Sequence, residues 1–290
     1  MIREFAAAKI NLTLRVGPVR PDGYHPVDSL VAFADWGDRL SFEPAETLSL
    51  DMTGEGADIL RAEDGNLILK AAEILAGAAG IVEPGARIRL EKSIPLGSGL
   101  GGGSADAAAT LRGLNRLWGM DWPDDMLAGL AAEIGSDVPA CVLSRPLRMR
   151  GRGEIVELLE HWPALNALLV NPRVSVPTGR IFALYDTDPQ RIGVMQNPVC
   201  LASGPAVAVI ASGRNDLQPH AAGAVGLVAD VLAALGELPG AHPVRMTGSG
   251  STCFALFESQ AAAVEAGRQL AAGHAGWLIQ PATLGGTETA

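Results

Sequence analysis

The sequence predicts an α+β fold with two domains. Its first half shows several strand-like segments before its first helices, and its second half alternates strands with helices, an order that disfavours a doubly wound parallel sheet. The chain has 290 residues, 48% of them hydrophobic, which is enough for two modest domains that each bury a core. We place the boundary near residue 160, so the predicted domains are 1–160 and 161–290.

The first half opens with a strand within residues 5–16, where apolar and polar side chains alternate before the turn-rich Gly17-Pro18 segment. Helix-period patterns and turn residues set the remaining elements. We expect strands at 29–34, 39–42, 47–52, 87–90, 141–149 and 155–159, and helices at 66–78, 104–118 and 123–134.

The second half shows a strand at 168–171 and a short helix after Thr178. Its later elements are a helix at 224–235, strands at 244–247 and 252–257, and a helix at 260–271. Residues 186–213 show no regular pattern; they are rich in proline and glycine and could form a lid or a long connection.

A glycine-rich run between the strand at 87–90 and the helix at 104–118 is the most informative stretch. Five glycines occupy seven positions, and Ser104 is positioned to cap the helix. Glycine permits a positive φ and close approach to a ligand, and a helix N-terminus attracts anions. We therefore predict a phosphate cradle formed by Pro95, Leu96, Gly97, Ser98, Gly99, Leu100, Gly101, Gly102, Gly103, Ser104 and Ala105.

Two common phosphate-binding motifs fit this run poorly. A Walker-type loop needs a lysine directly after its last glycine, and the chain contains no Gly-Lys dipeptide. A dinucleotide fingerprint matches Gly97, Gly99 and Gly102 by letter, but the third glycine lies inside a longer glycine block. Both readings are therefore disfavoured.

Composition excludes several kinds of partner. A net charge of −10 argues against nucleic acid, and no run of about 18 apolar residues or charged leader suggests a membrane. Three scattered cysteines favour a reducing, cytoplasmic location over a disulfide framework. Scattered histidines leave no zinc cluster. Only three lysines accompany 19 arginines, so Lys9 and Lys92 attract attention.

Several further motifs accompany the glycine run. They are Ala8-Lys9-Ile10-Asn11-Leu12, Arg20-Pro21-Asp22-Gly23-Tyr24-His25, Gly135-Ser136-Asp137-Val138-Pro139, Ser175-Val176-Pro177-Thr178, Asn215-Asp216 and Met246-Thr247-Gly248-Ser249-Gly250-Ser251. With these motifs the chain resembles the GHMP kinases over most of its length. The resemblance implies an N-terminal ribosomal-protein-S5-like domain and a C-terminal ferredoxin-like domain. Within the family it resembles the branch that phosphorylates a cytidine diphosphate-linked sugar alcohol in isoprenoid biosynthesis.

The resemblance implies transfer of the γ-phosphoryl group of ATP to a substrate hydroxyl. It assigns Asp137 as the general base and Lys9 as the group that holds and activates the hydroxyl. Asn11 and Thr178 are implied substrate contacts, and Lys92 an implied neighbour of the nucleotide. Alone, Asp137 could equally be a helix cap, and Lys9 a surface lysine at a strand edge.

Tyr24 and His25 are implied to recognise the cytosine. The tyrosine would stack on the base, the histidine would exchange hydrogen bonds with its edge, and Phe182 would cover the opposite face. The alternative is a loop aromatic that packs on its own domain beside an exposed histidine.

The glycine run departs from the family pattern at two positions. Ser98 stands where glycine is usual and Ala105 where a second serine is usual, so the hydroxyls that meet phosphate are redistributed. ATP arrives with Mg²⁺, and we assign Ser104 as its hydroxyl partner. We expect a monomer or a weak homodimer. Alternatives are a homoserine- or mevalonate-type kinase, a related decarboxylase, or a silent nucleotide-binding protein on the same fold.

Overall fold

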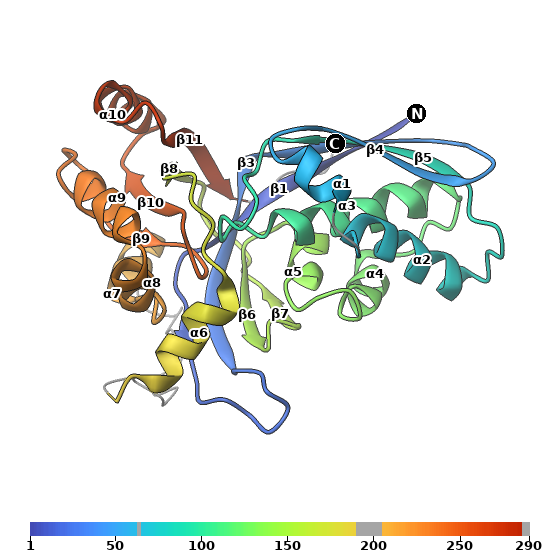
Figure 1. Ribbon diagram of the computed structural model, residues 1–290, viewed down its shortest axis with the longest axis horizontal. Helices are drawn as coiled ribbons and strands as arrows, with labels where there is room; N and C mark the ends of the chain where they lie inside the picture. The colour runs from blue at the N-terminus through green and yellow to red at the C-terminus, as the bar shows by residue number, and fades with distance from the viewer. Residues whose placement is uncertain (63–64, 190–204, 286–290) are drawn as a thin grey trace.

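The computed structural model describes residues 1–62, 65–189 and 205–285 (Figure 1). Its strands are β1 (Ile2–Asn11), β2 (Arg15–Val16), β3 (Val27–Glu43), β4 (Leu48–Gly54), β5 (Ala86–Lys92), β6 (Leu147–Gly151), β7 (Ile155–Leu158), β8 (Leu165–Asn171), β9 (Val244–Met246), β10 (Cys253–Phe257) and β11 (Leu278–Gly285). Its helices are α1 (Ala57–Ala62), α2 (Leu67–Ala79), α3 (Gly102–Leu117), α4 (Asp124–Ala131), α5 (Val138–Leu143), α6 (Thr178–Thr187), α7 (Ala206–Ser212), α8 (Gln218–Ala224), α9 (Gly226–Gly236) and α10 (Gln260–Gly273).

The described strands form one sheet in the order β4-β5-β3-β11-β8-β10-β9. Strand β3, 17 residues long, is its centre, because β1, β2, β5, β6 and β11 all pair with it. Only β4 and β5 pair in parallel; the other ladders are antiparallel. Strand β11 pairs with β3 and with β8, so the last described strand links the two halves of the chain.

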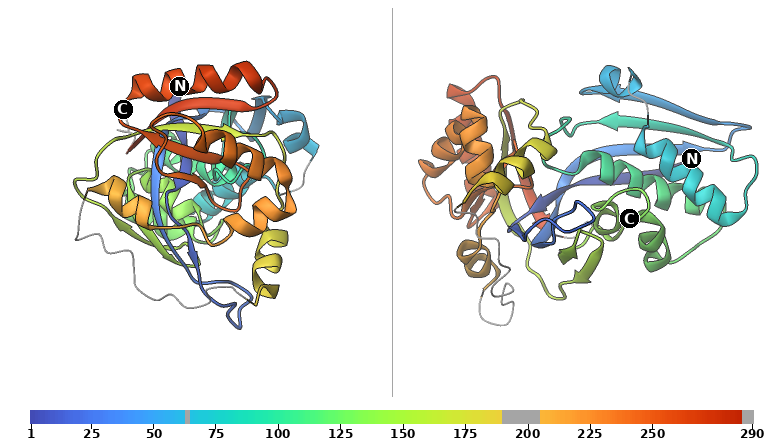
Figure 2. Two further views of the ribbon diagram at one scale, coloured as in Figure 1. Left: turned by 90° about the vertical axis from the view of Figure 1, so that its left-hand side faces the viewer. Right: turned by 60° about the horizontal axis from the view of Figure 1, so that its bottom comes forward.

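Helices cover each half of the sheet differently (Figures 1 and 2). In the first half α3 packs on β1 and β3, with α2, α4 and α5 around it. Strand β5 shows the resulting alternation: Ile88 and Leu90 are buried, whereas Arg89 and Glu91 are exposed on the other face. In the second half α9 and α10 pack on β8, β9 and β10. The boundary near residue 160 stays a prediction.

The α+β class is confirmed, but several predicted elements are corrected. The strands expected at 29–34 and 39–42 are one strand, β3, because the chain continues extended through Asp35-Trp36-Gly37. Residues expected in a strand at 141–149 begin as helix α5 and only then enter β6. The stretch 186–213, expected to be irregular, contains the end of helix α6 and the whole of helix α7, and its residues 190–204 lie outside the described residues. Strand β11 was not expected.

No single helix within the described residues is both long and apolar enough to span a bilayer, and α8 and α9 meet that test only together, as a pair bent by 118°.

A buried ion cluster ties together the elements that carry the glycine run. Lys92, the last residue of β5, places its Nζ 2.5 Å from Asp38 Oδ2 and 2.9 Å from Asp106 Oδ2. Asp38 Oδ1 also accepts the backbone N–H groups of Ser93 and Ile94, at 2.5 and 2.8 Å. The cluster therefore joins β3, the exit of β5 and the first turns of α3.

The cluster holds two carboxylates around one ammonium, so one negative charge lacks a partner. Asp106 Oδ1 is buried and has no hydrogen-bond partner within the described part of the chain. Burial raises the pKa of Asp106 to about 7, against the opposing charge of Lys92. Burial disfavours the charge of Lys92, but Asp106 and Asp38 outweigh it and raise the pKa of the lysine.

Packing between α3 and β3 generates a stability prediction. A Cβ at Gly113, in α3, would lie 2.3 Å from Cε2 of Phe42, a fully buried ring in β3. Gly113→Ala is expected to lower the free energy of unfolding by about 1–3 kcal/mol, because overpacking outweighs the better helix propensity of alanine. Gly129, exposed in α4 with nothing within 4 Å, is the matched control. Gly129→Ala should raise stability by about 0.5–1 kcal/mol. Urea unfolding of both variants measures this, and two changes of the same sign would contradict it.

Asp106 generates a prediction about pH. Because its folded pKa lies near 7 and its ordinary value is 3.8, the folded state holds a proton that the unfolded state lacks between those values. Unfolding then releases that proton, and the contribution of Asp106 to stability falls as pH rises through this window. Asp106→Asn should remove that loss. Unfolding curves measured at several pH values should show the wild type losing stability relative to the variant from about pH 4 to 7; parallel curves would refute the assignment.

Candidate active site

A cleft of about 840 Å³ gathers most of the predicted site residues, drawn from both halves of the chain. The predicted residues that line it are Lys9, Asn11, Tyr24, His25, Lys92, Pro95, Leu96, Gly97, Ser98, Gly99, Gly101, Gly102, Gly103, Ser104, Asp137, Thr178 and Phe182. Leu100 and Ala105 do not line it, because both side chains are buried in the core. These two therefore support the glycine run from behind.

Lys9 and Asp137 meet in this cleft as an ion pair, with 2.8 Å between Lys9 Nζ and Asp137 Oδ1. Strand β1 changes register against β3 between Ala7 and Lys9, and such irregularities commonly redirect a side chain beside a functional site. The Lys9 N–H donates to the carbonyl of Leu100 at 2.9 Å, which fixes this strand to the glycine run. The side chain of Lys9 is 3% exposed and that of Asp137 is 37% exposed, so the pair presents its carboxylate to the cleft.

Asp137 is not engaged as a helix cap. It occupies the N-cap position of α5, but its side chain makes no capping hydrogen bond and reaches Lys9 instead. The competing explanation for this aspartate, a simple cap before Val138, therefore does not describe its side chain. The pairing leaves a carboxylate at the cleft surface with a cation directly behind it.

The glycine run forms a tight connection into α3. Gly99 and Gly101 have φ values of +77° and +65°, a region in which other residues are strained. A Cβ on Gly99 would lie 2.6 Å from the carbonyl oxygen of Gly250, so the run also needs glycine to pack against the 246–252 segment. The carbonyl of Ser98 accepts both the N–H and the hydroxyl of Thr252, at 3.0 and 2.7 Å.

Helix α3 begins earlier than expected. Its first residue is Gly102 and its N-cap is Gly101, which has no side chain to cap it, so the prediction that Ser104 caps the helix is wrong. The first-turn N–H groups of a helix have no partners within the helix and are suited to bind an anion. The Ser104 hydroxyl lines the cleft and makes no hydrogen bond to any described residue.

Lys92 lines the cleft, but its charge faces inward. Its side chain is 1% exposed, and its ammonium is held by Asp38 and Asp106 as described above. A Cβ on Gly102 would lie 3.2 Å from Lys92 Nζ, so the lysine sits directly beneath the start of α3. The structure thus places this lysine as a support below the glycine run.

Asn11 and Thr178 are held by side chains from distant segments. Asn11 Nδ2 donates to Ser29 Oγ at 2.7 Å, and its backbone N–H donates to Thr247 Oγ1 at 2.8 Å. Thr178 Oγ1 lies 2.9 Å from Ser249 Oγ. Gly248 and Ser249 line the cleft as well, although we had identified them only as part of a family motif. The glycines and serines of 248–251 are the sequence signal that could have identified these two residues as part of the cleft.

His25 is more constrained than expected. Its Nδ1 lies 2.9 Å from the carbonyl oxygen of Gly17, and its Nε2 lies 3.3 Å from Asp186 Oδ2. Both ring nitrogens therefore have partners inside the protein; that this ring exchanges hydrogen bonds with a base edge stays a prediction. Phe182 packs against the histidine ring at 5.0 Å between centroids.

Tyr24 lies at the open side of the cleft. It is 50% exposed, and the guanidinium of Arg152 lies 4.9 Å from its ring centroid. One face of the ring thus contacts a cation, in keeping with a stacking surface. Asp186 and Arg152 line the cleft but had no place in the predicted site, because neither belongs to a recognisable motif.

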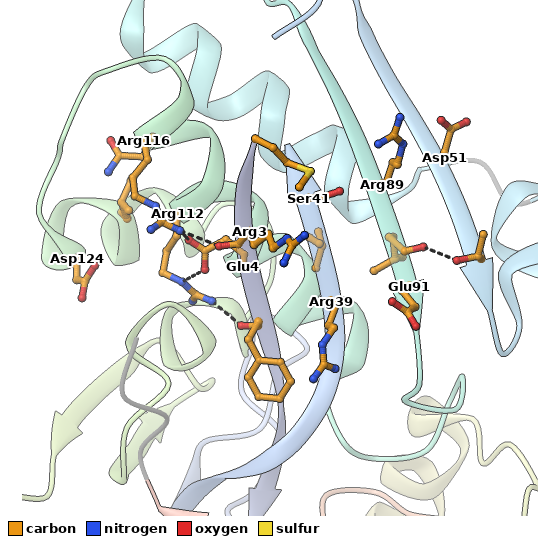
Figure 3. A pocket seen from close by; sticks show the side chains of 17 residues that line it. Arg3, Glu4, Arg39, Ser41, Asp51, Arg89, Glu91, Arg112, Arg116 and Asp124 are labelled. Carbon is orange, nitrogen blue, oxygen red and sulfur yellow. Dashed lines mark hydrogen bonds and ion pairs between the residues drawn. The ribbon is translucent and has the colours of Figure 1, made fainter. Parts of the chain in front are cut away.

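A second cavity, of about 940 Å³, contains none of the predicted site residues (Figure 3). Five arginines line it, and three of them form ion pairs with carboxylates. Glu4 pairs with Arg112 and Arg116, and Glu43 pairs with Arg89. Of these two cavities, only the first cleft contains the glycine run and the Lys9–Asp137 pair.

Two family descriptions match the chain: the N-terminal domain of the GHMP kinases over residues 66–145, and the C-terminal region of the GHMP kinases over residues 205–275. Among curated relatives, a 4-diphosphocytidyl-2-C-methyl-D-erythritol kinase of Cereibacter sphaeroides is 47% identical, covering 99% of this chain and all of the relative. One of Paramagnetospirillum magneticum is 46% identical and covers 96% of this chain and 97% of the relative.

Solved structures agree with this similarity. A crystal structure of 4-(cytidine 5'-diphospho)-2C-methyl-D-erythritol kinase superposes with a TM-score of 0.79 at 33% identity, covering 99% of this chain and all of that one. A homoserine kinase from Cytophaga hutchinsonii shares the fold, with a TM-score of 0.74 at 22% identity over 99% of this chain and 95% of its own. The fold is the two-domain α+β fold of these enzymes, and the chain belongs to the GHMP kinase family.

Proposed function

We propose that the chain is an ATP-dependent kinase that phosphorylates the C2 hydroxyl of 4-diphosphocytidyl-2-C-methyl-D-erythritol, a step of the non-mevalonate isoprenoid route. Full-length relatives of that name at 46–47% identity support the substrate. The observation that carries the chemistry is the Lys9–Asp137 pair, which faces the cleft beside the glycine run.

The proposed reaction depends mainly on positioning and charge. In phosphoryl transfer the protein holds the acceptor hydroxyl in line with the γ-phosphorus and neutralises developing charge. Asp137, exposed to the cleft, takes the proton of the hydroxyl, and the ammonium of Lys9 stabilises the oxygen as it becomes more negative. The first-turn N–H groups of α3 and the glycine run hold the phosphates of ATP.

Mg²⁺ is expected to enter with ATP, and this site suits that mode of binding. The described residues contain no group of three or more acidic, histidine or cysteine side chains that could hold a metal alone. Mg²⁺ bound to nucleotide phosphates usually keeps several waters and takes only one or two protein ligands. The unengaged hydroxyl of Ser104 in the cleft is the proposed ligand. The ion neutralises phosphate charge when bound.

Substrate recognition is assigned to cleft residues outside the glycine run. Tyr24 offers a half-exposed ring for the cytosine, with Phe182 as the second aromatic group. Asn11 and Thr178 are proposed contacts for the methylerythritol unit. We propose a cytoplasmic location as well: Cys141 and Cys253 are buried free thiols, as expected in a reducing compartment. A monomer or weak homodimer stays a prediction.

Phosphorylation assays test the proposal directly. Purified protein with ATP and Mg²⁺ should release ADP with 4-diphosphocytidyl-2-C-methyl-D-erythritol, and ³¹P NMR should show a new phosphate monoester. Homoserine and mevalonate are the control acceptors and should give no turnover. Turnover with either control in place of the cytidine compound would overturn the substrate assignment, and no turnover with any acceptor would favour a silent nucleotide-binding protein.

Asp137→Asn tests the assignment of the base. The substitution keeps the shape of the side chain but cannot accept the proton, so kcat should fall by about 10²-fold or more with little change in KM for either substrate. Asp51→Asn is the matched control, because Asp51 lines the second cavity. It should leave kcat unchanged. An Asp137→Asn enzyme with the kcat of the wild type would exclude Asp137 as the base.

A further inference from the structure

Helix α6 presents Thr178, Phe182 and Asp186 to the cleft at intervals of four residues, with Gly179 and Ala183 beside them. Residues four apart lie on one face of a helix, so the spacing explains why all three point the same way. Thr178 and Phe182 have proposed roles in binding the substrate. Asp186, one turn further along, has none in the mechanism derived above.

The contacts of Asp186 lead to the loop that carries Tyr24. Its Oδ2 lies 3.3 Å from Nε2 of His25, and the histidine side chain is 7% exposed. On the opposite side of the ring, Nδ1 lies 2.9 Å from the carbonyl oxygen of Gly17. The ring of His25, the last residue of the 17–25 loop, thus contacts Gly17 at the start of that loop and Asp186 on helix α6.

Both partners of the His25 ring are hydrogen-bond acceptors. A ring nitrogen that carries a hydrogen can donate it to either kind of oxygen. Hydrogen bonds in which a partner is charged are stronger than neutral ones. A hydrogen bond from the His25 ring to the carboxylate of Asp186 is therefore stronger than one to a neutral side chain would be.

Neighbouring contacts make α6 a firm support for this loop. Phe182 and Tyr185 contact the His25 ring, at 5.0 and 6.1 Å between centroids. The Tyr185 hydroxyl donates to the carbonyl of Val16 at 2.5 Å, directly before the loop begins. Helix α6 therefore contacts the chain directly before the loop, through Tyr185 and Val16, and the end of the loop, through His25.

We propose that Asp186 is a positioning residue for substrate specificity. It fixes His25 against Phe182, and so holds the adjacent Tyr24 ring where the base of the cytidine substrate binds. This inference rests on the proposed function, since it assumes that the Tyr24 loop binds the cytidine end of the acceptor. The ATP end of the cleft, built from the glycine run and α3, does not depend on Asp186.

Steady-state kinetics of Asp186→Ala test the proposal. KM for 4-diphosphocytidyl-2-C-methyl-D-erythritol should rise about tenfold, the size of one lost hydrogen bond to a charged group. The values of kcat and of KM for ATP should stay near those of the wild type. Asp186→Asn keeps an acceptor without the charge, so its KM should lie between those of the wild type and the alanine variant.

Asp188→Ala is the matched control. Asp188 lies two residues further on, its side chain is 32% exposed against 30% for Asp186, and it also pairs with a histidine, His220, at 3.0 Å. Its histidine does not line the cleft. The control should therefore leave KM for the cytidine substrate within about twofold of the wild type.

The outcomes separate the proposal from the function on which it rests. A wild-type KM in Asp186→Ala would overturn the positioning role, and so would equal rises in Asp186→Ala and Asp188→Ala, or a fall in kcat with a matching rise in KM for ATP, which would indicate a general loss of structure. If the wild type itself fails to phosphorylate the cytidine compound, the proposed function has failed instead.

Discussion

The buried ammonium of Lys92 is the interaction on which the phosphate end of the cleft depends. It lies between carboxylates from β3 and from the first turns of α3, while Asp38 also binds the two N–H groups at the exit of β5. These contacts add to the pairing of β5 with β3 and the packing of α3 on β1 and β3, which position the two elements that the glycine run connects. Removing the ammonium of Lys92 would leave two buried carboxylates without a countercharge, which is strongly destabilising.

This arrangement explains how a flexible sequence becomes an ordered site. Glycines supply the positive φ values of the run but no packing of their own. Order comes from the surroundings: Leu100 is buried and its carbonyl bonds to Lys9, and the carbonyl of Ser98 bonds to Thr252. The same contact that orders the run therefore also places Lys9 beside Asp137. The proposed phosphate cradle and the proposed base therefore share one framework.

The sequence allowed the glycine run to be placed between its strand and its helix because that part of the chain is local. The glycines, the strand before them and the helix after them are contiguous, and patterns within a short window report on them. Predictions failed where the structure depends on distant partners. Residues 141–143 are β-prone by composition but continue α5 against α3. Strand β11 is defined by pairing with β3 and β8, and no local pattern reports such pairing.

Dependence on distant partners also limits what the sequence predicts about the residues proposed to bind the acceptor. The environment of His25 is set by Gly17 and by Asp186, more than 150 residues later in the chain, and no motif joins them. A homoserine kinase shares this fold at a TM-score of 0.74 with only 22% identity. The framework can therefore be kept while most of the sequence changes. In the proposed function, the glycine run that would hold the phosphates of ATP is one continuous segment, whereas the residues that would bind the cytidine end of the acceptor come from two separate segments, α6 and the 17–25 loop.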